Sequence, residues 1–462
     1  MTKNFKRNSM GENALPTFAE ALRVYLKIAL YSFGGPAGQI AVMHKYVVEE
    51  KKWLGENRFL HALNYCMLLP GPEAQQLVTY IGWLLHGRRG GIVAGALFVL
   101  PGFLAILILS IIYALWQDVG FVQGIFYGIK PAVLAIVIGA VIKIGKKALK
   151  NEVMVGMAVL AFLAIFFFKI TFPIIVVAAG LIGFIGGKVW EDKFLVVKGH
   201  ADVRGSEEGL IDRLIQPIKP SLSTTFKTAV FWLALWLLPV ALLALTLGME
   251  NIFTKQGFFF SQSALVTFGG AYSVLAYISQ KAVETYGWLQ PGEMLDGLGM
   301  AETTPGPLIQ VVQFVGFMGA FRFAGYLDPV LAGVLASVLV TWVTFVPSFL
   351  FIFTGAPYIE QLRGNKSLTT ALSGITAAVV GVVLNLGIWF SLHTLFKQMG
   401  ELNFGALHVP LPEWGSVDWG AVFITVAAMF LYFGIKWDML KTIGACVVIG
   451  LIIKLLVVNP GL

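Results

Sequence analysis

Apolar runs of about twenty residues recur along most of this chain, and no other feature constrains its fold as strongly. The hydrocarbon core of a bilayer is about 30 Å thick, so each spanning helix needs about 20 apolar residues. Of 462 residues, 57% are hydrophobic and only 13% are charged, which is too little charge to cover a soluble protein. Because helices satisfy their own backbone groups in lipid, the sequence predicts an all-α polytopic membrane protein.

Two of the apolar runs are broken by the same tripeptide, Pro70-Gly71-Pro72 in the first half and Pro305-Gly306-Pro307 in the second. The apolar arms beside these breaks have about 11–14 residues, or roughly 16–21 Å of helix, which falls short of a full bilayer. The breaks at Gly34-Gly35 and Gly269-Gly270 divide further runs. Each pair of arms is therefore either one kinked span or a re-entrant hairpin, which gives thirteen spans, or nine spans and four hairpins.

The breaks belong to an internal duplication. Phe33-Gly34-Gly35 recurs as Phe268-Gly269-Gly270, Trp53-Leu54 as Trp288-Leu289, and the first Pro-Gly-Pro as the second, all at one constant offset along the chain. We call positions related by this offset equivalent. We expect a first transporter repeat at 1–190 and a second at 251–462. Residues 191–250 are expected to form a cytoplasmic linker and one connecting span.

Basic residues predict the orientation, because short cytoplasmic loops carry an excess of Lys and Arg. The N-terminus, Arg88-Arg89, the segment from Lys143 to Lys150 and the linker should all be cytoplasmic. These loops account for the formal net charge of +8 without a nucleic-acid partner. The connecting span then starts the second repeat on the opposite side, so we expect inverted-topology repeats, with the C-terminus outside and the site at their interface.

The breaks also predict a binding site. A helix that begins at Pro72 or Pro307 has free N–H groups and partial positive charge in its first turn, which suits an anion at mid-membrane. The alternative is that the breaks are kinks required only for packing. Inward-facing polar groups and the glycines of the breaks complete the expected substrate-binding set, which is Gly34, Gly35, Gly71, Pro72, Gln75, Gln76, Lys130, Gly269, Gly270, Thr304, Gly306 and Gln310.

Three ionisable residues at membrane depth have functional and structural interpretations. Glu73 and Glu302 could each carry a coupling proton, whereas Glu73 could instead compensate a helix N-terminus and deter an anion when ionised. Lys130 could offset substrate charge, or its side chain could extend to the membrane surface. The two cysteines lie in apolar segments, so we expect no metal site and no cofactor.

Two other classes of protein compete with a secondary transporter. A membrane-embedded enzyme needs clustered aspartates or a Ser/His pair, whereas the aspartates of this chain are scattered near segment ends. That distribution argues against an enzyme. An anion channel of the same architecture remains an alternative, because channels and transporters can share repeats.

The motifs Phe33-Gly34-Gly35-Pro36, Pro70-Gly71-Pro72 with Gln75-Gln76, and Gly87-Arg88-Arg89-Gly90-Gly91 resemble the chromate ion transporter family in its long, two-domain form. The resemblance implies a chromate exporter of the bacterial plasma membrane, acting in metal resistance as a proton-coupled antiporter, with sulfate as a related substrate. A transporter or channel for another inorganic anion such as sulfate is the alternative. The expected partners are the oxyanion, protons and the lipid bilayer. The expected assembly is a homodimer.

Overall fold

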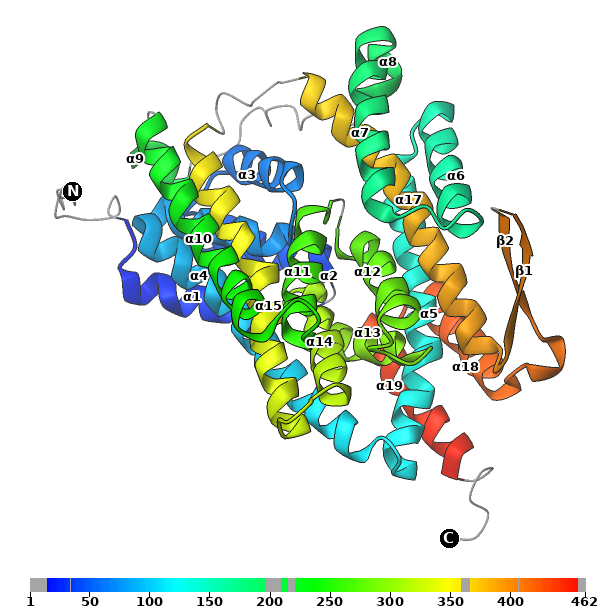
Figure 1. The fold of residues 1–462 in the computed structure, drawn as a ribbon. Helices are drawn as coiled ribbons and strands as arrows, with labels where there is room; N and C mark the ends of the chain where they lie inside the picture. The colour runs from blue at the N-terminus through cyan, green and yellow to red at the C-terminus, as the bar shows by residue number, and fades with distance from the viewer. Residues whose placement is uncertain are drawn as a thin grey trace.

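The computed structural model describes residues 15–33, 35–195, 209–214, 221–268, 270–358, 366–405 and 407–455 (Figure 1). These residues are helical except for loops and one two-stranded hairpin. Six of their helices are long and apolar enough to cross a membrane, namely Glu73–Trp116, Gly120–Ala148, Phe172–Val189, Leu222–Leu247, Pro329–Tyr358 and Lys366–Leu395.

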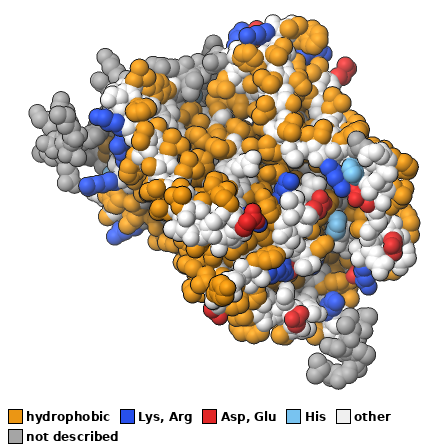
Figure 2. Space-filling model, viewed as in Figure 1, with side chains coloured by type: hydrophobic (Ala, Val, Ile, Leu, Met, Phe, Trp, Pro, Cys, Tyr) orange, Lys and Arg blue, Asp and Glu red, His pale blue; other side chains and the backbone are white. Residues whose placement is uncertain are grey.

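The surface of the molecule is largely apolar. Hydrophobic side chains cover much of the face shown in Figure 2, while charged side chains lie in small groups. On the helix Leu222–Leu247, for example, Leu222 and Leu245 are 82% and 83% exposed. Soluble monomers rarely expose apolar surface on this scale, so lipid must cover it. The prediction of an all-α polytopic membrane protein is confirmed.

The first half of the chain consists of helices that follow one another with short connections. They are α1 (Phe18–Tyr31), α2 (Gly35–His44), the π-helical turn η1 (Lys45–Glu50), α3 (Glu56–Leu68), α4 (Glu73–Trp116), α5 (Gly120–Ala148), α6 (Glu152–Phe166) and α7 (Phe172–Val189). Three further helices lie between the halves, α8 (Glu191–Phe194), α9 (Leu210–Leu214) and α10 (Leu222–Leu247).

The second half repeats much of this order. Its elements are α11 (Ile252–Leu265), α12 (Ala271–Gln280), η2 (Lys281–Thr285), α13 (Glu293–Thr303), η3 (Leu308–Gln310), α14 (Val311–Arg322), α15 (Pro329–Gly355), η4 (Ala356–Tyr358), α17 (Lys366–Leu395), β1 (Met399–Phe404), β2 (Leu407–Pro412), η5 (Trp414–Ser416), α18 (Trp419–Met429), η6 (Phe430–Gly434) and α19 (Met439–Ile453).

Local structure recurs at equivalent positions of the two halves. The N–H of Trp53 donates to the carbonyl of Val47 at 2.8 Å, and the N–H of Trp288 donates to the carbonyl of Ala282 at 2.8 Å. A kink divides α4 at His86 and Gly87, where Gly87 has a φ of 62° that glycine tolerates. Its two parts therefore correspond to the separate helices α14 and α15.

The long helices pack into two groups that lie on either side of the short central helices (Figure 1). In one group α4 and α15 pack with α1, α10, α11 and α14. In the other, α5 packs against α18 and α19 of the second half, while α17 packs against α6 and α7 of the first. Glycines on α5 and α17 permit these crossings. For example, a Cβ on Gly128 would collide with the carbonyl of Cys446, and one on Gly374 with that of Ala179. The halves are therefore interleaved.

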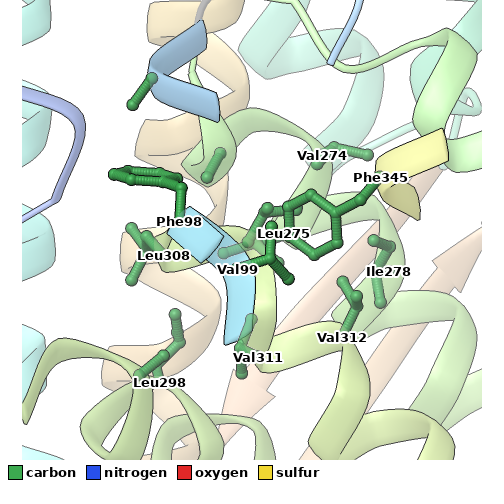
Figure 3. Packing of buried hydrophobic residues seen from close by; sticks show 14 of the residues in the cluster. Phe98, Val99, Val274, Leu275, Ile278, Leu298, Leu308, Val311, Val312 and Phe345 are labelled. Carbon is green, nitrogen blue, oxygen red and sulfur yellow. The ribbon is translucent and has the colours of Figure 1, made fainter. Parts of the chain in front are cut away.

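Apolar side chains from several of these elements meet beside the second Pro-Gly-Pro break. Figure 3 shows Phe98 of α4, Leu275 of α12, Leu308 of η3, Val311 of α14 and Phe345 of α15 within one cluster. All five side chains are buried. This packing holds the break between helices from both halves.

A β-hairpin between α17 and α18 was not predicted from the sequence. β1 and β2 pair antiparallel, with Gly405 at a φ of 63° in the turn. An ion pair of 2.6 Å between Lys169 and Glu401 attaches the hairpin to the α6–α7 loop. The Lys169 ammonium lowers the pKa of the Glu401 carboxyl group. The residues of β1 do not alternate strictly between apolar and polar, and β2 contains two prolines, so neither segment has a clear strand signal.

Candidate functional site

Two reciprocal hydrogen bonds hold the broken helices of the two halves together. The N–H of Gly71 donates to the carbonyl of Thr267 at 2.8 Å, and the N–H of Gly306 donates to the carbonyl of Ser32 at 2.9 Å. The two donors are equivalent to each other, and so are the two acceptors. Each Pro-Gly-Pro break is thus bonded to the end of the helix before the Gly-Gly break of the opposite half.

The central glycine of each break has a conformation that other residues rarely adopt. Gly71 has a φ of 121° and Gly306 a φ of 108°. A Cβ on Gly71 would lie 3.2 Å from the hydroxyl oxygen of Ser348, and one on Gly306 would lie 3.2 Å from the Cα of Gly102. A side chain at either glycine would therefore be both strained and crowded.

A small cleft lies between the two breaks. Its lining residues are Pro36, Gln39, Gly71, Pro72, Glu73, Ala74, Thr267, Gly270, Ala271, Pro307, Leu308 and Ile309. Several of them form equivalent pairs, such as Pro72 with Pro307 and Pro36 with Ala271. The centre of a water molecule can occupy ≈ 20 Å³ of it, which is room for about one water. The cleft is therefore too small for an oxyanion in this conformation and would have to widen to hold one.

Two helix starts face the cleft. The first helical hydrogen bond of α4 runs from the N–H of Gln76 to Pro72 at 3.0 Å, so the N–H groups of the three preceding residues have no acceptor within the helix. The second start is similar, because the N–H of Gln310 donates to Pro307 at 2.9 Å and the N–H groups of Leu308 and Ile309 precede it. Both starts carry partial positive charge, and Glu73 supplies the charged side chain among the lining residues.

The three predicted glutamines lie behind the cleft and not in its lining. Gln76 donates to the carbonyl of Pro70 at 2.8 Å and so braces the first break. Gln310 donates to Gln313 at 2.6 Å. Gln75 is fully buried, and neither side-chain polar atom has a hydrogen-bond partner among the described residues. A buried amide without hydrogen-bond partners lowers the stability of the fold. Of the three glutamines, Gln75 would therefore gain most from hydrogen bonds to a ligand or a water.

Gln39 is a cleft residue that sequence reasoning missed. Its side-chain amide donates to the carbonyl of Gly306 at 2.6 Å and is 1% exposed. Val274 occupies the equivalent position in the second half, so this bond has no counterpart. The sequence signal was a lone glutamine three residues after Pro36 in an apolar run.

Two further predicted residues lie at the end of α13, Glu302 in its last turn and Thr304 directly after it. Glu302 is 3% exposed, and its carboxylate accepts a hydrogen bond from the hydroxyl of Tyr272. Thr304 directs its hydroxyl to the carbonyl of Ala301 at 3.4 Å, within its own chain segment. Neither side chain lines the cleft, although both lie immediately before the second break.

Lys130 lies away from the cleft, in a charged network at the other end of α13. Its ammonium pairs with Asp296 at 3.2 Å, and the hydroxyl of Tyr113 donates to the same carboxylate oxygen at 2.9 Å. Arg322 binds both oxygens of Glu293, at 2.8 and 2.6 Å. Sequence reasoning assigned Asp296 to a segment end, but it is 1% exposed. The signal that could have found it is an Asp one turn after Glu293 in a short helix.

Gly34 and Gly269 lie outside the described residues. Their neighbours Gly35 and Gly270 have φ values of 70° and 102°, and Gly270 lines the cleft. Among the residues that the structure describes, no group of three or more His, Cys, Asp or Glu side chains could hold a metal ion.

The sequence matches known transporters. A family model described as Chromate transporter matches residues 19–184 and 254–451. The chromate transport protein of Pseudomonas aeruginosa is 31% identical over 78% of this chain and 77% of its own length. The chromate transport protein of Cupriavidus metallidurans is 25% identical over 79% of this chain and 81% of its own. A probable chromate transport protein of Synechococcus elongatus is 26% identical, with shares of 78% and 81%.

No solved structure matches the chain. The resemblance that the sequence motifs indicated is confirmed by the family match, which covers both halves of the chain. The match to the Pseudomonas aeruginosa protein also covers more than two thirds of each sequence. The chain therefore belongs to the chromate transporter family.

Proposed function

We propose that this protein is a secondary transporter that exports chromate across the bacterial plasma membrane. The observation that carries the proposal is the pair of reciprocal hydrogen bonds at Gly71 and Gly306, which turns two helix starts toward one cleft. Unpaired N–H groups at helix starts bind oxyanions without a cationic side chain. Sulfate has the same charge and tetrahedral shape as chromate, so it is the related substrate.

The halves act as inverted repeats around this cleft, with repeat one at 1–190, the linker and connecting span at 191–250, and repeat two at 251–462. The N-terminus is cytoplasmic and the C-terminus is outside. Opening the cleft alternately to each side moves the anion. An inside-negative potential favours departure of a divalent anion by about 4.6 kcal/mol per 100 mV, twice the value for one charge.

The coupling proton binds at Glu73, with Glu302 as the second candidate, and the membrane potential drives export. When ionised, Glu73 presents a carboxylate to the helix starts that the anion needs, so the two compete for the same positive potential. Protonation of Glu73 removes this competitor. Coupling of this kind links the charge state of one side chain to occupation of the cleft.

Chromate uptake into everted membrane vesicles, with sulfate as competitor, tests the proposal. We expect energised vesicles to accumulate chromate to a concentration above that outside. This accumulation should fall when sulfate is added. Purified protein in proteoliposomes then separates the alternatives, because purely passive flux would identify a channel. Accumulation of sulfate without chromate would identify a sulfate transporter. Sizing of the purified protein in detergent tests the homodimer.

A further inference from the structure

The ion pair between Lys130 and Asp296 joins the two halves of the protein away from the cleft. Lys130 belongs to α5 in the first half and Asp296 to α13 in the second, with the ammonium and carboxylate 3.2 Å apart. The Lys130 side chain is 31% exposed, whereas that of Asp296 is 1% exposed. Another ion can therefore approach the lysine, while the carboxylate is enclosed.

The neighbouring carboxylate, Glu293, shows what a structural ion pair looks like in this network. Its two oxygens accept both arms of the Arg322 guanidinium, and the N–H of Gln290 donates to it at 2.6 Å. Bidentate pairs with additional donors are the arrangement that makes a buried ion pair stable. Glu293 and Arg322 therefore form a stable ion pair, and binding of an anion does not require it to break.

Asp296 is satisfied far less completely. One oxygen, Oδ2, takes both the Lys130 ammonium and the Tyr113 hydroxyl, while Oδ1 has no hydrogen-bond partner among the described residues. An ionised carboxylate offers about four acceptor sites, so half of its capacity is unused. Gly292 lies beside the lysine, and a Cβ there would be in ordinary contact with the ammonium, at 3.6 Å. The Lys130 side chain is thus partly exposed, while the carboxylate that it pairs with has unused acceptor capacity.

We propose that Lys130 is a second binding station for the transported oxyanion and that Asp296 occupies this station while no anion is present. The inference rests on the proposed function, because it assigns a further step to the same anion. α13 connects the two places, since Asp296 is eight residues before Thr304, or about 12 Å along the helix. The arriving anion displaces the carboxylate from the ammonium, and the carboxylate returns when the anion leaves.

The test is chromate transport by purified variants in proteoliposomes, measured as half-saturating concentration and maximal rate. Asp296→Asn removes the competing charge at nearly constant volume. We expect its half-saturating concentration to fall about tenfold and its maximal rate to fall as well, because the anion leaves more slowly.

Lys130→Gln should raise the half-saturating concentration about tenfold. Glu293→Gln is the matched control and should reduce the yield of folded protein without increasing affinity.

An exchanged pair, Lys130→Asp with Asp296→Lys, separates binding from structure. A merely structural ion pair would be restored by this exchange together with transport, and that result would overturn the proposal. An unchanged half-saturating concentration in Asp296→Asn would also overturn it, and Asp296→Ser serves for the same measurement if the asparagine variant does not fold. If the wild-type protein moved neither chromate nor sulfate, the proposed function itself would fail. Transport by the wild type with no response to Asp296→Asn would reject only the second station.

Discussion

A single carboxylate, Glu73, stands where two helix starts meet. It begins α4, lines the cleft, and follows the proline of the first break, whereas Leu308 occupies the equivalent position in the second half. The cleft is therefore asymmetric in charge although its backbone is nearly symmetric. An ionised carboxylate at this point stabilises the helix start and repels a second anion.

We expect Glu73→Gln to lower the half-saturating chromate concentration about tenfold, equivalent to about 1.4 kcal/mol, because a like charge is removed from the cleft. The variant should also lose the dependence of transport on an imposed pH gradient. Transport assays in proteoliposomes at several values of pH measure both effects. Glu250→Gln, at a carboxylate that is 91% exposed, is the control and should behave as wild type. A pH response as large as that of the wild type would exclude Glu73 as the coupling group.

The buried amide of Gln75 permits a different kind of test. Removing a buried polar group that lacks partners is neutral or stabilising for the fold. We therefore expect Gln75→Leu to unfold at the same temperature as wild type or a higher one, while chromate transport falls at least tenfold. Combination with Gln310→Leu should reduce transport further. Retention of wild-type transport in the double variant would remove both glutamines from the site.

At the scale of elements, the connectors that precede α3 and α13 share a backbone hydrogen bond, that of Trp53 and of Trp288, but the helices that follow them carry opposite charges at one equivalent position. Arg58 and Glu293 occupy equivalent positions in the two halves. In the second half Glu293 itself accepts the N–H of Gln290. In the first half the equivalent N–H, that of Gly55, is accepted at 2.7 Å by Asp212 of α9, which also pairs with Arg58 at 3.1 Å. The segment between the halves thus supplies the carboxylate that the first half lacks at this position.

We expect Asp212→Ala to cost about 1–3 kcal/mol, because the part-buried N–H of Gly55 loses its acceptor and the part-buried guanidinium of Arg58 loses its carboxylate partner. Thermal unfolding in detergent measures the loss, which should appear as a lower midpoint. Asp192→Ala, at an exposed residue of the short helix α8, is the control and should leave the midpoint unchanged. Equal midpoints for the two variants would show that α9 does not stabilise the first repeat.

Much of this arrangement could be predicted from the sequence, because the information was local or repeated. Residue types alone identify the Pro-Gly-Pro breaks and their central glycines, Gly71 and Gly306. Comparison of residue numbers gives the constant offset between the two halves. The partners of those breaks could not be predicted in this way. Gln39, Asp296 and the hairpin at 399–412 owe their roles to contacts between distant segments, which composition and periodicity do not encode.

At the scale of the whole molecule, the proposed inversion of the two halves makes a prediction about topology. We expect cysteines introduced at Arg89 and Tyr326, both exposed and in matching connections, to be labelled from opposite sides of the membrane. A membrane-impermeant thiol reagent applied to intact cells and to everted vesicles makes the measurement. The native Cys66 and Cys446 are fully buried and should remain unlabelled in the parent protein. Labelling of both positions from one side would rule out inverted repeats.

The interleaving of the halves has a consequence for biosynthesis. α5 needs α18 and α19 as packing partners, but these helices are synthesised about 300 residues later, roughly 15–60 s at 5–20 residues per second. During that interval the glycine-bearing face of α5 around Gly128 must rest against lipid or an insertion factor. A ribosome that stalls between the halves would therefore leave an inserted intermediate whose unpaired face marks it for quality control.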